Sequence, residues 1–157
     1  MMAQDRPARA RRWPSRAAIL ALALPLPAHA WEAETEGPLC TLTHTTPEVT
    51  LRLTYDPGLA EYAITLGLMG ATWPDAAVFA LEFFGAQPNQ IATSLHQLSD
   101  HGAALTVTDR GFGNVLDGLQ FNDTATALAG TEAVTIPLEG AAPAVIQFRT
   151  CTEMPLA

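Results

Sequence analysis

Residues 106–123 read TVTDRGFGNVLDGLQFND and hold the densest group of side chains in this chain that could do chemistry. Asp109 and Asp117 offer carboxylates for acid–base work or for a cation. With Arg110 and Asn114 they form a candidate polar site for a small hydrolase or a metal-dependent enzyme. Known loop motifs do not support it, because neither the EF-hand spacing D-x-D-x-D-G nor the phosphate loop G-x-x-x-x-G-K-[ST] occurs here.

Turn chemistry offers a second interpretation of the same segment. Gly111 and Gly113 permit a sharp exit from a strand that ends near Asp109. Asn114 is then expected to cap a short helix with Asp117 in its first turn. The residues of this helix that would face the core are Phe112, Val115, Leu116 and Leu119. Alternatively, Asp117 and the glycine after it make a two-residue hairpin turn. In either case we interpret 106–123 as a structural corner.

The histidines and serines do not form a catalytic or metal-binding set. His96 and His101 lie close to Asp100, but neither a His-x-x-x-His nor a Cys-x-x-Cys spacing accompanies them. After residue 30 the only serines are Ser94 and Ser99, and neither sits in G-x-S-x-G. The sequence therefore predicts no catalytic triad, no metal site and no cofactor. It favours a non-enzymatic binding or envelope-associated domain, with an enzyme at 109–117 as the alternative.

Short runs of alternating hydrophobicity organise the chain from residue 40 onward. Period-two alternation of apolar with polar residues is typical of strands with one buried face, and clusters of Gly, Pro, Asn and Asp separate these runs. The expected inward faces are Val49/Leu51/Leu53/Tyr55, Tyr62/Ile64/Leu66/Leu68, Ala77/Phe79/Leu81/Phe83, Leu105/Val107 and Val134/Ile136/Leu138. We predict a mainly β fold, a small antiparallel β-sandwich or barrel of six to eight strands.

The segment GAAPAVIQFRTC departs from this alternation. Its apolar residues recur at helical spacing from Ala141 to Phe148, with Pro143 in the first turn and Arg149 in the last. Cys151 continues the apolar stripe three residues after Phe148. The sequence therefore predicts a short C-terminal α-helix that turns Cys151 toward the sheet.

The first thirty residues have the layout of a secretory signal peptide. Five arginines precede an uncharged run from residue 17 to Ala30, which ends in the A-x-A pattern of a cleavage site. A membrane span needs about 20 apolar residues, and this run is shorter and is broken by Pro25 and Pro27. We predict cleavage between Ala30 and Trp31. Residues 31–157 would then be one periplasmic or secreted domain with no membrane span, and the pair of adjacent arginines leaves the general secretory and twin-arginine routes both open.

The predicted export bears on the oxidation state of the two cysteines. In an oxidising compartment Cys40 and Cys151 are expected to form one disulfide that joins the first strands to the C-terminal helix.

Residues 31–157 also keep only three arginines and no lysine against fifteen acids, a formal charge of −12. Binding to nucleic acid or to anionic lipid requires clusters of Lys and Arg, so both are excluded as functions. The expected partner is an unknown protein or a cationic small ligand.

The segment VTIPLEGAAPAVIQFRTC, residues 134–151, resembles the closing segment of small exported bacterial proteins of the invasion-associated locus B type. The resemblance covers about a tenth of the chain, and Trp31 and Cys40 match the early W-x-x-x-C portion of those proteins only loosely. It implies an envelope protein with a signal peptide, a β-rich body and paired cysteines. It transfers no site residues.

Overall fold

The computed structural model describes residues 30–153, which form ten strands, one 3-10 turn and two α-helices. The strands are β1 (Glu32–Glu36), β2 (Leu39–Thr45), β3 (Val49–Asp56), β4 (Glu61–Leu68), β5 (Phe79–Gly85), β6 (Asn89–Thr93), β7 (Gln97–Ser99), β8 (Ala104–Asp109), β9 (Asn122–Ala129) and β10 (Glu132–Pro137). The helices are α1 (Gly113–Phe121) and α2 (Ala141–Thr152), and the 3-10 turn η1 spans Asp100–Gly102. The predicted mainly β fold is confirmed, with more strands than the six to eight expected.

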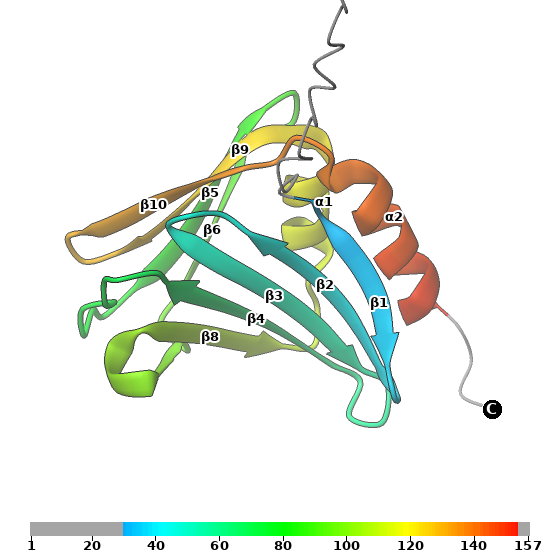
Figure 1. Cartoon of the computed structure of the whole chain (residues 1–157), viewed down its shortest axis with the longest axis horizontal. Helices are drawn as coiled ribbons and strands as arrows, with labels where there is room; N and C mark the ends of the chain where they lie inside the picture. Colours follow the sequence, from blue (N-terminus) through cyan, green and yellow to red (C-terminus); the bar gives the residue numbers. More distant parts are fainter. Residues whose placement is uncertain (1–29, 154–157) are drawn as a thin grey trace, which may run out of the picture.

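Two antiparallel sheets face each other (Figure 1). The larger sheet has the strand order β1-β2-β3-β4-β8-β7, and the smaller has the order β10-β9-β5-β6. The chain passes from the larger sheet to the smaller after β4 and returns through residues 94–96, which join edge strand β6 to edge strand β7. The sheets part toward one end, and α1 lies there, between them (Figure 1).

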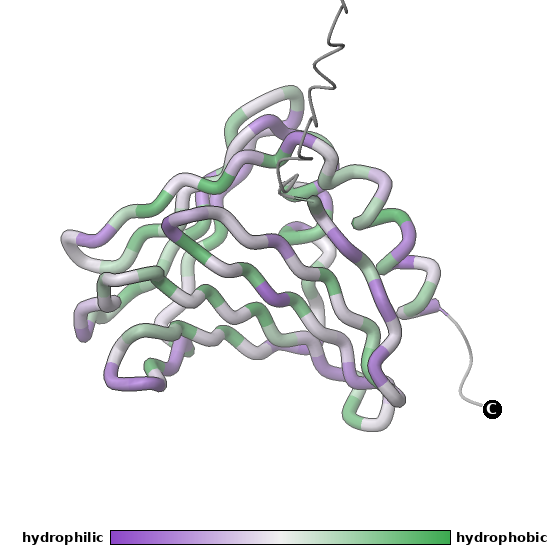
Figure 2. Tube along the Cα trace, in the orientation of Figure 1, coloured by the Kyte–Doolittle hydropathy of each residue, from purple (hydrophilic) through white to green (hydrophobic). Residues whose placement is uncertain are grey.

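The predicted inward faces account for most of the core. Leu51, Leu53 and Leu66 of the larger sheet are at most 1% exposed, and Phe79, Leu81 and Phe83 of the smaller sheet are buried with them in one cluster. Figure 2 shows the alternation of hydrophobic and hydrophilic residues along the strands of the larger sheet. The prediction was wrong at Ala77, which is exposed and precedes β5 in a long connection. Apolar residues that alternate in the sequence therefore share one buried face where their segment forms a strand.

The C-terminal helix and the disulfide are confirmed. In α2 the residues Ala141, Ala144, Val145 and Phe148 are buried, and the helix packs on α1, β1 and β2. Cys151 in the last turn is bonded to Cys40 in β2, with 5.9 Å between their Cα atoms. The two periodicities, helical at the end and alternating at the start, thus placed both cysteines correctly.

The acidic residues before Cys40, which showed no apolar alternation, form a strand. Glu32–Glu36 is β1, the edge of the larger sheet, with most of its side chains exposed. Trp31 just before it is 8% exposed and stacks on the His44 ring, with 4.3 Å between the ring centroids. The strand forms because its backbone pairs with β2 and because α2 packs against it.

The predicted signal peptide lies almost wholly outside the described residues, which begin at Ala30. Among residues 30–153, no helix has both the length and the apolar character needed to cross a membrane.

Candidate functional site

A cleft opens between the two sheets beside α1. Its volume is about 230 Å³. It lies between edge strand β6 of the smaller sheet and β8 of the larger one, with the start of α1 at one end. The apolar side chains that form its floor and walls include Ile64, Phe79, Leu81, Ile91, Val107 and Phe112. We call this feature the inter-sheet cleft.

The rim of the inter-sheet cleft combines one exposed apolar residue with a few polar ones. Leu95, in the connection from β6 to β7, is 72% exposed and borders the opening. Thr93 and Thr108 contribute hydroxyl groups, and Asp109 and Asn114 contribute a carboxylate and an amide. An apolar hollow with few polar groups at its edge is the usual composition of a binding site.

The structure brings only part of the predicted polar site together. Asp109 at the end of β8 and Asn114 in α1 both border the inter-sheet cleft. Arg110 is exposed and does not line it. Asp117 is engaged elsewhere, because its Oδ1 accepts a hydrogen bond from Nη2 of Arg149 in α2 at 2.5 Å. The four residues therefore do not converge on one point.

Asp109 has a local partner. Its Oδ1 accepts a hydrogen bond from the backbone N–H of Arg110 at 2.6 Å, where the chain leaves β8 for α1. This contact supports the interpretation of the segment as a corner. It leaves the second carboxylate oxygen of Asp109 available at the rim of the cleft.

The predicted helix exists, but Asn114 does not cap it. The helix begins at Gly113, the N-cap position is Phe112, and no side chain caps it. Asn114 contributes its backbone oxygen, which accepts a hydrogen bond from Nδ2 of Asn89 in β6 at 3.3 Å. The cap was wrong because the helix starts two residues earlier than an Asn114 cap requires, at Gly113 instead of Val115.

Two further expectations for this helix were also wrong. The alternative of a hairpin turn at Asp117 and Gly118 fails, because the helix runs unbroken from Gly113 to Phe121. Asp117 lies in its middle and not in its first turn. The apolar residues expected to face the core, Phe112, Val115, Leu116 and Leu119, are all buried. Apolar spacing therefore predicted the buried face of the helix better than its polar residues predicted its start.

The two histidines near this side of the molecule do not share a site. The ring of His96 lies beside the ring of Phe79, with 6.2 Å between the centroids. His101 is exposed in η1 with a φ of 57°. Within residues 30–153, no group of three or more His, Cys, Asp or Glu side chains is arranged to hold a metal ion.

Ion pairs occupy two of the three arginines in residues 31–157. Nη1 and Nη2 of Arg52 donate to Oε1 and Oε2 of Glu36 at 3.1 and 2.7 Å, a bidentate pair across the larger sheet. This hydrogen bonding lowers the pKa of Glu36 from its ordinary value of 4.5 and raises that of Arg52. Arg149 is paired with Asp117. Most of the excess negative charge therefore remains unpaired on the surface of the molecule.

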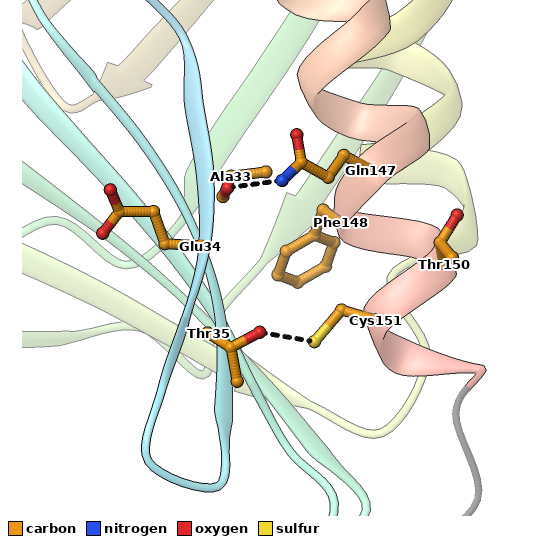
Figure 3. Close-up of a pocket in the computed structure, with 7 residues that line it drawn as sticks. All are labelled: Ala33, Glu34, Thr35, Gln147, Phe148, Thr150 and Cys151. Carbon is orange, nitrogen blue, oxygen red and sulfur yellow. Dashed lines mark hydrogen bonds between the residues drawn. The ribbon is translucent and has the colours of Figure 1, made fainter.

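A second hollow, of about 270 Å³, lies between β1 and α2 beside the disulfide (Figure 3). Nε2 of Gln147 donates a hydrogen bond to the backbone oxygen of Ala33 at 2.9 Å, and Oγ1 of Thr35 lies 3.7 Å from Sγ of Cys151. These contacts cross the hollow from helix to strand, as Figure 3 shows. We interpret it as the seam where α2 covers the outer edge of β1.

The inter-sheet cleft was not predicted from the sequence. Its walls come from four strands and a helix that are distant in the chain. One local signal was present: Leu95 is a leucine within the otherwise polar run TSLHQ, at the point where the chain crosses between the sheets. No family model, no curated protein and no solved structure matches this chain.

Proposed function

We propose that this protein is a non-enzymatic, exported β-domain of the bacterial periplasm or envelope, and that it binds a partner at the inter-sheet cleft. The observation that carries the proposal is the cleft itself, an apolar hollow whose mouth is bordered by the exposed side chain of Leu95. Phe79, Leu81 and Ile91 line this opening, and an apolar hollow with a few polar groups at its rim is the usual form of a binding site.

Export is supported by two independent features. The disulfide between Cys40 and Cys151 suits an oxidising compartment, and residues 1–30 have the pattern of a signal peptide. The resemblance of residues 134–151 to proteins of the invasion-associated locus B type points to the same compartment. The intact mass of the protein recovered from the periplasm should match that of a chain whose first residue is Trp31.

The charge of the domain indicates the chemistry of the partner. Three arginines stand against fifteen acids in residues 31–157, and two of those arginines are already in ion pairs. A partner that carries positive charge would be attracted to such a surface, and like-charged molecules would be repelled.

Site-specific photocrosslinking in the producing organism tests the proposal. A photoreactive amino acid replaces Leu95 at the cleft in one variant and Leu59 in a matched control. Leu59 is a leucine that is 63% exposed in the turn between β3 and β4, outside the residues that line the cleft. We expect a crosslinked product in the envelope fraction from position 95 and none from position 59. Equal products from both positions, or none from position 95, would contradict the proposal.

The alternative, a metal-dependent enzyme at 109–117, makes a different prediction for the purified protein. A cation held by Asp109 or Asp117 would raise the melting temperature in proportion to its occupancy. We expect calcium and zinc to leave the melting temperature unchanged, since Asp117 already pairs with Arg149. A rise of several degrees that disappears in Asp109→Ala would favour the enzyme.

A further inference from the structure

Two of the four outermost strands of this sandwich have an edge that is protected against further pairing, and a third is protected at one end. The outer edge of β1 is covered by α2, whose Gln147 side chain bonds to the backbone oxygen of Ala33. β7 is only three residues long. β10 is protected only at its end, where Pro137 has no N–H to donate, and its register still turns the N–H groups of Ala133 and Thr135 outward. Such devices prevent a sheet from adding a foreign strand. The fourth outermost strand, β6, is five residues long and borders the inter-sheet cleft.

The hydrogen-bond register shows which backbone groups of β6 face outward. The N–H of Leu138 bonds to the oxygen of Asp123 at 2.9 Å, and these two residues are direct partners in the continued register of β9 and β10. Since bonded and non-bonded pairs alternate in antiparallel sheets, the alternation can be followed through β9 and β5 to β6. It makes Leu81 and Ile91 a hydrogen-bonded pair. The N–H and C=O groups of Gln90 and Ala92 therefore point away from the sheet.

The same reasoning identifies a free group on the opposite side of the inter-sheet cleft. The N–H of Leu68 bonds to the oxygen of Ala103 at 2.8 Å, in register with the pairing of β4 and β8. The backbone groups of Thr106 and Thr108 then point away from β4. β7 pairs with Thr106, but its register ends there, so Thr108 is left at an open edge. Unpaired backbone groups thus border the cleft on both sides.

We infer that the partner is an extended segment of polypeptide that pairs with the outer edge of β6 and inserts apolar side chains into the inter-sheet cleft. The inference rests on the proposed function and names the partner's class. A strand added beside β6 would lie about 4.8 Å from it, over the cleft. Its side chains on the face shared with Ile91 would enter the hollow, so every second residue of the segment is apolar.

The size and chemistry of the inter-sheet cleft favour a polypeptide over a small molecule. Its volume of about 230 Å³ lies below the range of roughly 300–1,000 Å³ for drug-sized ligands, and it suits one or two inserted side chains. A strand would pair with the outward N–H and C=O groups of Gln90 and Ala92, whereas an aliphatic ligand has no polar groups with which to bind them. Asp109 at the rim and the acidic surface favour a segment that carries Lys or Arg.

The test uses two proline variants of the mature protein. Ala92→Pro removes an outward N–H from β6 and places the ring where an added strand would lie. Ala133→Pro does the same on β10, at the opposite edge of the same sheet, where the register also turns the N–H outward. Neither substitution breaks a bond within the sheet, and edge strands tolerate proline at such positions. The two variants are therefore a matched pair.

The probe is a set of short acetylated and amidated peptides that alternate leucine or valine with threonine or lysine, and binding is measured by fluorescence anisotropy. We expect binding to the unmodified protein and to Ala133→Pro. In Ala92→Pro we expect at least about a tenfold loss of affinity, roughly what one hydrogen bond contributes. Failure of every peptide to bind would overturn the inference, and so would an equal loss in both variants.

A second measurement needs no change to the protein. Methylation of one backbone nitrogen of the peptide at a time should reduce binding at every second position and leave it unchanged at the others, because only alternate residues face β6. Equal tolerance at all positions would overturn strand addition. Val107→Phe, which fills the inter-sheet cleft from β8 and leaves the sequence of β6 unchanged, should weaken peptides with a bulky apolar residue at the inserted position more than peptides with alanine there.

These outcomes separate the inference from the proposed function. If position 95 still crosslinks to a partner when Ala92 is replaced by proline, the domain binds at the cleft but not by strand addition. If the crosslinked product is a second copy of this chain, the inference of a foreign segment is wrong. Loss of the crosslink in Ala92→Pro and its retention in Ala133→Pro would support both the proposed function and the inference of strand addition.

Discussion

Gly118 in the middle of α1 offers a test of how tightly the helix is packed against the smaller sheet. A Cβ atom at this position would lie 2.6 Å from Cγ of Phe83 and closer still to two further atoms of the same ring. Phe83 is 1% exposed, in the centre of β5. The ring has no flexible end that could move aside, so Gly118→Ala must push either the ring or the helix.

Two effects of opposite sign decide the result. Alanine is favoured over glycine in a helix by about 1 kcal/mol, which would stabilise the variant. Forcing an extra carbon into a filled core costs about 1–3 kcal/mol. Because the contact is with a fully buried ring, we expect overpacking to exceed the gain in helix propensity and the free energy of unfolding to fall by up to about 2 kcal/mol. For a domain of this size that corresponds to a melting temperature lower by up to about 8 °C.

Thermal and urea unfolding of the mature protein, followed by circular dichroism, provide the assay. Gly113→Ala is the matched control, since it lies in the same helix and a Cβ there meets nothing within 4 Å. It should leave stability unchanged or increase it. In a Phe83→Leu background the ring is gone, and Gly118→Ala should then become neutral or stabilising. If Gly118→Ala stabilises the unmodified protein as much as Gly113→Ala does, the packing argument is refuted.

Three further predictions concern the bonds that tie the molecule together. Reduction, or Cys40→Ala, should lower the melting temperature markedly, with about 4.7 kcal/mol as the upper limit from loop entropy; an unchanged melting curve would show that the bond contributes nothing. Asp117→Asn should cost at most about 1 kcal/mol, because its pair with Arg149 is partly exposed, and the loss should shrink in high salt. The pKa of Glu36 is lower in the folded protein, so the stability from its pair with Arg52 is present above about pH 4.5 and is lost as the pH falls through the folded pKa. Melting curves at a series of acidic pH values should show this dependence, and Arg52→Gln should weaken it.

The fold could be predicted from the sequence wherever a pattern was local. Alternation along Val49, Leu51 and Leu53 required only that one face of a strand be buried, and the structure buries it. The helical stripe before Cys151 predicted both the helix and the direction of the cysteine. In each case the spacing of the apolar residues matches the period at which side chains return to the same face of a strand or a helix.

Features that depend on tertiary contacts were not predicted. β1 is acidic and mostly exposed, and its pairing with β2 and packing against α2 decide its conformation. Asp117 was expected in a first helical turn or a hairpin turn, and its pair with Arg149 was not predicted, because Arg149 lies far along the chain in another helix. The inter-sheet cleft depends on how far two sheets separate around α1, which no local pattern encodes.

The disulfide joins residues 111 positions apart, one in the second strand and the other in the last helix. Because a polypeptide is made from its first residue to its last, Cys40 exists as a thiol throughout almost the whole synthesis of the domain. A chain that stops before residue 151 keeps that thiol, whereas a finished chain loses it on folding. An oxidoreductase that tests for a reactive thiol could therefore tell incomplete molecules from complete ones, and only the former would remain open to exchange. Formation of the bond therefore requires a chain that extends at least to residue 151.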